Sequence, residues 1–108
     1  MAVYLISIYT IRMIRNFKTK KSQDIFNGIV SSQARKIPVV LHDKARRLFD
    51  QINAATRIET LRIPPGNNLE KLKGNLKNYW SIRINKQWRI IFKWQNGEAF
   101  NVDIVDDH

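Results

Sequence analysis

The sequence predicts an α+β fold, because a helical pattern in the middle of the chain is followed by strand patterns in its last third. Between Pro38 and Ala55, apolar residues recur at helical spacing and charged residues cover the other side. From Tyr79 onward, apolar and polar residues alternate in successive segments separated by short polar loops, as in an antiparallel meander. The chain has 108 residues and neither repeats nor linkers, so it forms one domain with one modest core.

The elements before the meander follow from helix start and stop signals. A brief helix begins near Lys20 and ends near Gly28, because glycine suits the left-handed conformation of a C-cap. Pro38 can occupy the first turn of a second, amphipathic helix, which ends near Ala54 or Ala55. We also expect a short strand at residues 14–17, a helical turn at residues 58–61 and a loop at residues 63–68.

The strands of the meander are expected at residues 69–72, 79–84, 88–94 and 100–105. In the second and third of these strands, tryptophan, isoleucine and phenylalanine fall on one face. The opposite face carries Tyr79, Ser81, Arg83, Arg89, Ile91 and Lys93. Since side chains alternate between the two faces of a strand, one face is apolar and the other is cationic.

The lengths of the loops decide which side chains face each other. A two-residue turn at 96–97 would put Phe100 on the cationic face, whereas a three-residue loop at 95–97 pairs it with Phe92 on the apolar face. A slip of one residue moves every side chain to the other face, so burial favours the three-residue loop. The same argument gives a loop at 85–87 in the first hairpin.

This register places Arg83 opposite Arg89, and Arg89 opposite Asp103 on its other side. Like charges directly opposite each other destabilise a sheet, so the arginine pair requires an anion. Asp103 supplies one, and a phosphate group would supply another.

The charge balance indicates the same kind of partner. The chain has 19 Lys and Arg against 9 Asp and Glu, a net charge of +10, which favours a polyanion such as nucleic acid. Anionic lipid is the alternative, but no basic amphipathic helix of the membrane type stands out. Without cysteine, disulfides and thiolate zinc sites are excluded, and two histidines argue against a histidine-rich metal site. We therefore expect a cytoplasmic protein without metal or cofactor.

The first twelve residues are set apart from the domain. The apolar run that ends at Ile11 is too short to cross a bilayer as a helix, and it lacks the features of a signal peptide. It is either an additional edge strand or an extension upstream of a start at Met13. We favour an extension at residues 1–12 and a single domain at residues 13–108.

Four segments form a combined pattern that is more specific than any one of them. They are MIRNF at 13–17, LRIPPGN at 61–67, LEKLKGNLKNYWSIRINKQWRIIFKW at 69–94 and VDIVDDH at 102–108. Together they resemble the RelE superfamily of bacterial toxins, closest to its HigB branch. The resemblance covers the chain from Met13 to His108.

The resemblance implies helices packed on one face of a small, twisted, mainly antiparallel sheet. It also implies an endoribonuclease that cuts mRNA, often in the ribosomal A site. The implied partners are the ribosome and a helix-turn-helix antitoxin of the HigA type, in a toxin–antitoxin complex that binds operator DNA. No membrane is involved.

Such a nuclease must deprotonate a ribose 2′-hydroxyl, stabilise the charged phosphorane and protonate the leaving 5′-oxygen. Because the ribose is itself the nucleophile, no metal is required. The resemblance implies that Glu70 is the general base, that Arg89 and Lys73 contact the scissile phosphate, and that His108 is the general acid. Each residue also has an alternative role. Glu70 could be an ordinary surface glutamate, and Arg89 could form a structural pair with Asp103. Lys73 could contact only ribosomal RNA, and His108 could be a frayed terminal histidine.

The end of the chain departs from the family. Relatives commonly end in Asp-Tyr-His, whereas this chain ends in Asp106, Asp107 and His108. Asp106 therefore joins the expected catalytic set, but the aromatic residue that could stack on a base is replaced by an acid.

The remaining candidates would bind the substrate rather than transfer protons. Arg83 and Lys93 carry charge that phosphates need, although Arg83 could contact ribosomal RNA instead. Tyr79 is treated first as a sheet residue and second as a base-stacking group. His42 is expected on a polar helix face, away from the sheet and inert.

Two classes of function remain open. One is a ribosome-dependent endoribonuclease toxin, and the other is a catalytically weak nucleic-acid-binding domain of the same fold. The presence of both Glu70 and His108 favours the enzyme.

Overall fold

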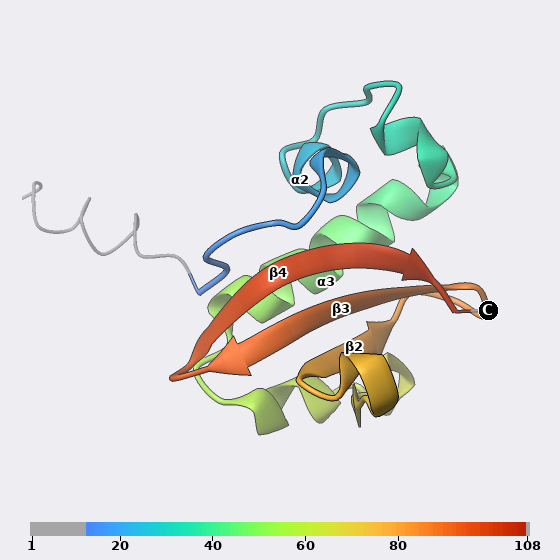
Figure 1. Cartoon of the computed structure of the whole chain (residues 1–108). Helices are drawn as coiled ribbons and strands as arrows, with labels where there is room; N and C mark the ends of the chain where they lie inside the picture. The colour runs from blue at the N-terminus through green and yellow to red at the C-terminus, as the bar shows by residue number, and fades with distance from the viewer. Residues whose placement is uncertain (1–12, 108) are drawn as a thin grey trace, which may run out of the picture.

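A four-stranded antiparallel sheet with helices on one face forms the body of the protein in the computed structural model, which describes residues 13–107 (Figure 1). The strands follow one another in the sheet as β1 (Glu70–Lys71), β2 (Tyr79–Arg83), β3 (Trp88–Gln95) and β4 (Glu98–Asp106). The α-helices are α2 (Lys20–Phe26) and α3 (His42–Ala54). Short 3-10 helices occupy the loops: η1 (Ala34–Lys36), η2 (Val39–Leu41), η3 (Ile58–Arg62), η4 (Pro65–Asn67) and η5 (Gly74–Leu76). The predicted α+β fold is confirmed.

Both α-helices begin and end close to the predicted residues. α2 follows Thr19, whose hydroxyl accepts a hydrogen bond from the backbone N–H of Ser22 at 3.4 Å, and Gly28 beyond its end has a φ of +75°. Pro38 precedes η2, which leads directly into α3, so the helical region starts with a 3-10 turn. Within residues 13–107, no helix is long and apolar enough to span a membrane.

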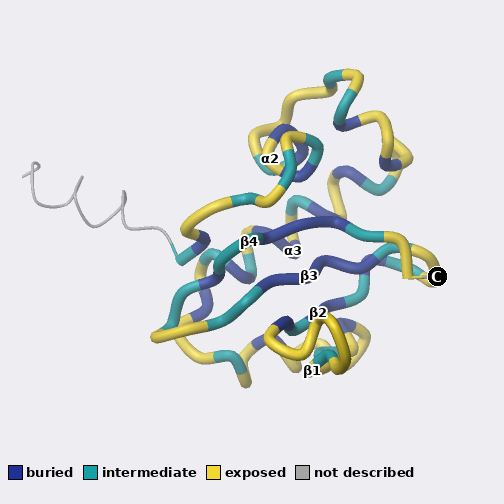
Figure 2. The backbone as a smooth tube through the Cα atoms, in the orientation of Figure 1, coloured by how far each residue is buried: buried dark blue, intermediate teal, exposed yellow. Residues whose placement is uncertain are grey.

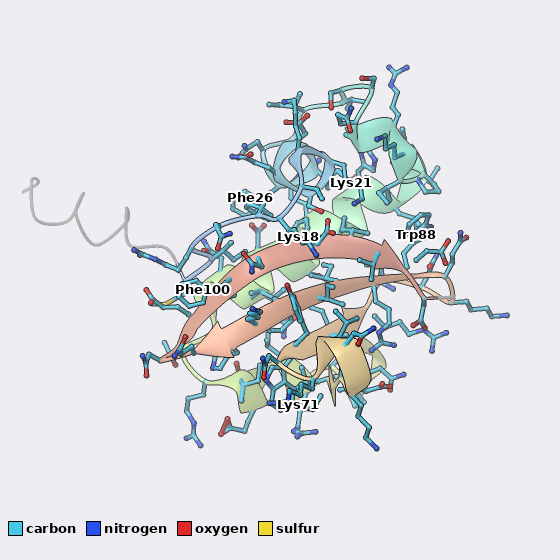
Figure 3. All side chains as sticks on the ribbon, viewed as in Figure 1. Lys18, Lys21, Phe26, Lys71, Trp88 and Phe100 are labelled. Carbon is cyan, nitrogen blue, oxygen red and sulfur yellow. The ribbon has the colours of Figure 1, made fainter. Side chains whose placement is uncertain are left out.

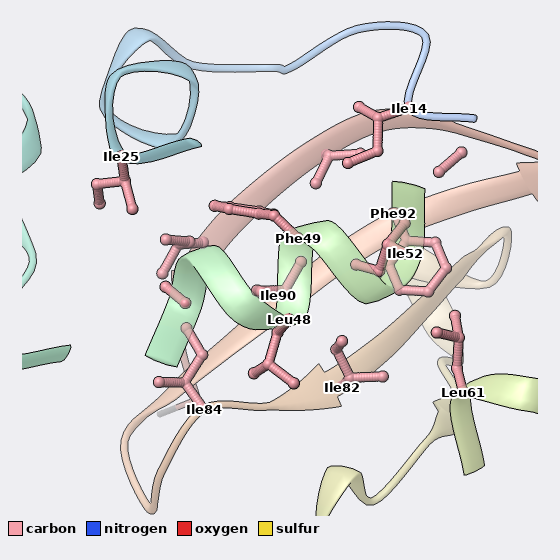
Figure 4. Packing of buried hydrophobic residues seen from close by; sticks show 14 of the residues in the cluster. Ile14, Ile25, Leu48, Phe49, Ile52, Leu61, Ile82, Ile84, Ile90 and Phe92 are labelled. Carbon is pink, nitrogen blue, oxygen red and sulfur yellow. The ribbon is translucent and has the colours of Figure 1, made fainter. Parts of the chain in front are cut away.

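The hydrophobic core lies between α3 and the apolar face of the sheet. Phe49 and Ile52 of α3 have no exposed surface, and neither do Ile82 of β2 or Ile90 and Phe92 of β3 (Figure 4). Burial of each such side chain contributes roughly 1.5–3 kcal/mol. Figure 2 shows the central strands as the most continuously buried part of the chain. The apolar face predicted from alternation is therefore the face that packs on α3.

The outer edge of β4 is covered by residues 14–18, which run parallel to it. Two isolated bridges join Ile14 to Ala99 and Phe17 to Val102. The backbone N–H of Lys18 donates to the carbonyl of Val102 at 2.9 Å. The predicted strand at 14–17 thus appears as two bridges, and they satisfy backbone groups that an edge strand would otherwise expose.

The hairpin between β2 and β3 has the predicted register. Ile82 lies opposite Ile90, and Arg83 lies opposite Arg89. The backbone N–H of Ile84 donates to the carbonyl of Trp88 at 2.9 Å and closes the loop at 85–87.

The hairpin between β3 and β4 differs from the prediction. Gln95 lies opposite Glu98, so the connection is the two-residue turn that burial had disfavoured. Asn96 and Gly97 both have positive φ, 55° and 77°, as a tight turn of this kind requires. Phe100 consequently lies on the face away from α3.

A bulge in β4 restores the apolar face after this turn. The register shifts between Ile91 and Lys93, where Asn101 adopts a φ of +52°. The additional residue returns Val102 and Ile104 to the core, where neither has exposed surface. The predicted three-residue loop was wrong, because the bulge, rather than a longer loop, turns the apolar side chains of β4 toward the core.

The predicted contact between Arg89 and Asp103 is also wrong. Asp103 lies opposite Ile91 instead. Its Oδ1 accepts hydrogen bonds from Thr19 Oγ1 at 2.6 Å, Ser22 Oγ at 2.9 Å and Lys21 Nζ at 3.1 Å. Asp103 therefore joins the start of α2 to β4, and Figure 3 shows Lys21 above that strand.

His42 corrects another expectation, because it does not lie on a solvated helix face. Only 3% of it is exposed, and its Nε2 lies 2.9 Å from the carbonyl oxygens of both Ala34 and Ile37. The side chain turns back from the start of α3 and holds the preceding loop. Its position away from the polar sheet face agrees with the prediction.

Candidate functional site

The sheet face opposite α3 is cationic, as predicted, but its centre is buried. Ser81 has no exposed surface, Ile91 is 3% exposed and Arg89 is 7% exposed. On this side η4 lies against β2, and the backbone carbonyl of Asn68, which follows η4, accepts a hydrogen bond from Arg89 of β3. The face is therefore accessible mainly at its margins.

Arg89 is held at two points of its guanidinium group. Its Nε donates to Ser81 Oγ at 2.9 Å, and its Nη2 donates to the backbone carbonyl of Asn68 at 2.9 Å. A guanidinium has five N–H donors in a rigid plane, so two bonds fix its orientation and leave donors for a ligand.

Glu70 lies on the same face as Arg89, with β2 between their two strands. β1 pairs with β2 so that Glu70 is opposite Ser81, the residue that binds Arg89. Glu70 Oε1 lies 3.9 Å from Arg89 Nη2, and the side chain of Glu70 is 55% exposed whereas that of Arg89 is 8% exposed. The structure thus brings together two residues that the sequence nominated from separate strands.

Arg83 adds a second guanidinium directly across from Arg89. Its Nε donates to the carbonyl of Asn85 at 3.1 Å, within the turn of the first hairpin. The predicted arginine pair is present, and its neighbours are the carboxylate of Glu70, the hydroxyl of Ser81 and the backbone carbonyls of Asn68 and Asn85 rather than Asp103.

Lys73 is exposed at the start of η5, three residues after Glu70. Its backbone carbonyl accepts a hydrogen bond from the N–H of Leu76 at 3.2 Å. The short 3-10 turn therefore places this lysine shortly after β1 and leaves its side chain in solvent.

Lys93 and Tyr79 face each other at the other end of the polar face. The Lys93 Nζ lies 5.5 Å from the centre of the Tyr79 ring, and Tyr79 is only 8% exposed. Lys71 makes a similar contact with Trp80, at 5.2 Å, along the edge of the sheet. A cavity of about 390 Å³ at this end is lined by Lys71, Asn78, Lys93, Trp94 and Gln95.

The described chain end runs beside the first hairpin. Asp106 lies opposite Trp88 and accepts a hydrogen bond at its Oδ2 from Gln87 Nε2 at 3.0 Å. The backbone N–H of Asp107 donates to the carbonyl of Gln87 at 2.6 Å. Asp106 therefore belongs to the strand end near the arginine pair. His108 lies outside the described residues.

Sequence reasoning missed the residues that orient the charged groups. Ser81 was placed on the polar face by alternation, but nothing in the pattern identified it as the acceptor for Arg89 Nε. Asn68 acts through its backbone carbonyl, for which the sequence contains no signal. Within residues 13–107, no three His, Asp or Glu residues are grouped so that they could hold a metal ion.

Residues 15–108 match the family described as the RelE-like toxin of the type II toxin–antitoxin system HigB. The chain belongs to this family. It is 40% identical over 96 residues to Toxin HigB-1 of Vibrio cholerae, which covers 89% of this chain and 98% of that protein. It is 33% identical over 96 residues to Endoribonuclease HigB of Proteus vulgaris, covering 89% of this chain and all of that protein. An uncharacterized protein of Haemophilus influenzae is 42% identical over 73 residues, covering 68% and 71% of the two chains.

The resemblance inferred from the four segments is therefore confirmed. A HigB-like toxin belongs to a type II toxin–antitoxin system, which implies an antitoxin as its partner. The predicted enzyme class agrees with the name of the Proteus relative.

Proposed function

We propose that this HigB-like toxin is an endoribonuclease that cleaves mRNA by attack of the ribose 2′-hydroxyl on the adjacent phosphate. The observation that carries the proposal is the approach of Glu70 to Arg89, 3.9 Å apart on the polar face of the sheet. Glu70 is an exposed carboxylate that can accept a proton, and Arg89 is a fixed cation that has N–H donors left for a ligand.

In this reaction Glu70 takes the proton of the 2′-hydroxyl as its oxygen bonds to phosphorus. Arg89 binds two oxygens of the phosphorane, where negative charge develops, and Lys73 adds a second cation. The bond from phosphorus to the 5′-oxygen breaks, and His108 protonates that oxygen, with Asp106 beside the chain end. The products carry a 2′,3′-cyclic phosphate and a free 5′-hydroxyl. The ribose supplies the nucleophile, so neither a metal nor a cofactor is needed.

The prior fixation of Arg89 supports this role. Because Ser81 and Asn68 orient the guanidinium in the free protein, little reorganisation is needed when the charged transition state forms. Electrostatic stabilisation is most effective when the donor is already in place.

The other basic residues of the face bind the remainder of the RNA. Lys93 lies four residues from Arg89 along β3, about 13 Å at the rise of a strand, so it can hold a phosphate further along the RNA. Tyr79 is buried beneath Lys93 and supports that side chain. Arg83 neighbours Arg89 and contacts the same stretch of backbone, either in mRNA or in ribosomal RNA.

The expected setting is the cytoplasmic ribosome, where the mRNA is presented, and the expected antitoxin is a helix-turn-helix protein of the HigA type. The complex of the two proteins would bind operator DNA. The net charge of +10 supports a partner rich in phosphate or carboxylate groups.

The test uses toxin released from its antitoxin, with free mRNA and with mRNA in a reconstituted translation system. Cleavage should be abolished by a single 2′-deoxy residue at the cut site, and the products should have 5′-hydroxyl ends. Cutting of the deoxy substrate, or 5′-phosphate ends, would contradict attack by the 2′-hydroxyl. Tight RNA binding without any cleavage would instead support a nucleic-acid-binding domain.

A further inference from the structure

The loop before β1 is fixed to α3 by one buried side chain. Asn67 is 4% exposed, and its Nδ2 donates to Gln51 Oε1 at 3.0 Å and to the carbonyl oxygens of Leu61 at 3.1 Å and Ile63 at 3.4 Å. Gln51 in turn donates from Nε2 to the carbonyl of Ile63 at 2.6 Å. We call these two residues the Gln51–Asn67 bracket.

The bracket ends next to the residue that holds Arg89. Asn68 follows Asn67 directly and has a left-handed backbone, with φ 51° and ψ 52°. In this conformation its carbonyl accepts the hydrogen bond from Arg89 Nη2 at 2.9 Å. A continuous path of hydrogen bonds and one peptide unit therefore leads from α3 to the guanidinium.

We propose that Gln51 and Asn67 are positioning residues for the reaction, because they hold the carbonyl of Asn68 where it orients Arg89 beside Glu70. This inference rests on the proposed function. The hydrogen bonds of the two side chains go to each other and to the carbonyls of Leu61 and Ile63, so both act through the backbone of Asn68.

The physical reason lies in what Arg89 does when this carbonyl moves. With only Ser81 as an acceptor, the guanidinium is free to turn its Nη2 toward Glu70, which is already 3.9 Å away. A closed ion pair would use donors that the phosphate needs and would occupy the carboxylate that must accept a proton. The Gln51–Asn67 bracket therefore keeps the guanidinium of Arg89 near the carboxylate of Glu70 and prevents the two from forming a closed ion pair.

Asn67→Asp is the sharpest variant, because it keeps the size of the side chain and replaces its donor with an oxygen that faces three oxygen acceptors. We expect kcat to fall by about ten- to a hundred-fold with KM changed much less, since a misplaced group affects the transition state most. In Gln51→Ala, kcat should also fall, by a smaller factor. Gln51 is less buried than Asn67, so this variant still tests the inference if Asn67→Asp unfolds.

The matched control is Asp50→Asn, which alters the exposed neighbour of Gln51 on the same helix and should leave kcat unchanged. A second comparison uses the backbone of Asn68. Asn68→Gly permits positive φ and should retain more activity than Asn68→Val, whose branched side chain opposes that conformation. Equal activity of these two variants would contradict a role for the left-handed carbonyl.

A spectroscopic measurement separates this inference from the proposed function. In ¹⁵N-labelled toxin, the Nη2–H signal of Arg89, assigned by its loss in Arg89→Lys, should shift in Asn67→Asp, because Nη2 loses its bond to the carbonyl of Asn68. An unmoved signal, or an unchanged kcat in folded Asn67→Asp, would overturn the positioning role. If the wild-type toxin cleaves no RNA, the proposed function fails, and the signal still shows whether the bracket orients Arg89.

Discussion

Glu70 and Arg89 approach each other across β2, with Oε1 and Nη2 3.9 Å apart. This distance exceeds the roughly 2.7–2.9 Å of a charge-assisted hydrogen bond. Arg89 donates to Ser81 and Asn68 instead, so the arginine is fixed while the carboxylate remains half exposed. Such asymmetry suits a pair in which one group must bind a phosphate and the other must receive a proton.

Arg89→Ala should lower kcat/KM by about a hundred- to a thousand-fold, as loss of a donor to a developing charge does. Arg89→Lys should recover only part of this activity, because an ammonium group cannot make the planar two-point contact. Initial rates on a defined mRNA in a translation system measure both effects.

Stability must be followed in the same Arg89 variants, because the side chain is buried. Arg89→Ala leaves Ser81 Oγ and the carbonyl of Asn68 without this donor, which costs about 1–3 kcal/mol of the free energy of unfolding. Denaturant titrations should show a folded protein that still binds the antitoxin. If activity and folding are lost together in both variants, Arg89 is a structural residue.

A chain that begins at Met13 should fold and cleave RNA as the full chain does, because the candidate site residues all follow that position. Residues 14–18 provide the backbone contacts that cover β4, and they are retained. The matched control begins at Lys18 and should be unstable. It loses the contacts of residues 14–17 with β4 and the ring of Phe17, whose centre lies 5.2 Å from that of Phe26. Loss of folding in the chain that begins at Met13 would show that residues 1–12 are part of the domain.

Acid should weaken the attachment of the loop after α2 through Asp24. The hydroxyl of Ser31, which donates to Asp24 Oδ2 at 2.6 Å, lowers the pKa of this carboxyl below its usual 3.8, and Lys20 adds to the effect. A carboxyl with a depressed pKa in the folded state stabilises the protein above its unfolded pKa, and this contribution is lost as the pH falls through the folded value.

The Ser31→Ala variant tests this dependence by urea unfolding at pH 7 and near pH 3. The stability difference from wild type should be larger at pH 7. Ser31 also accepts a hydrogen bond from the N–H of Ala34 at 3.0 Å, and the loss of that contact is independent of pH. A difference that is equal at both pH values would assign the whole effect to Ala34.

The sheet faces could be predicted because alternation is local, and the first hairpin because only one loop length buries its apolar residues. The second hairpin could not be predicted, because a bulge at Asn101 and a longer loop both place Val102 and Ile104 on the apolar face. Choosing between them requires knowing that Phe100 can lie on the outer face, which depends on packing that is not local.

The candidate site also contains features that the sequence predicted and features that it did not. Glu70, Arg83 and Arg89 were identified from the residue pattern and the family resemblance, and the structure places them on one face. The burial of Arg89 was not foreseen, because the carbonyl that covers it comes from Asn68, 21 residues earlier. A backbone acceptor in an irregular loop carries no side-chain signature.

The assignment of acid and base rests on Glu70 and on His108 at the chain end. Glu70→Gln keeps the size of an exposed side chain, and deletion of His108 removes a residue beyond the end of β4 at Asp106, so neither change should unfold the protein. Each should lower kcat by about a hundred- to ten-thousand-fold, the usual contribution of one proton-transfer group, while RNA binding changes little. Single-turnover cleavage and binding of a 2′-deoxy RNA that cannot be cut measure the two quantities separately.

Lys44→Gln, on the outer side of α3, is the control for a change of surface charge and should leave kcat unaltered. Wild-type rates in both site variants would leave only electrostatic stabilisation by Arg89 and Lys73, and the assigned proton transfers would be wrong.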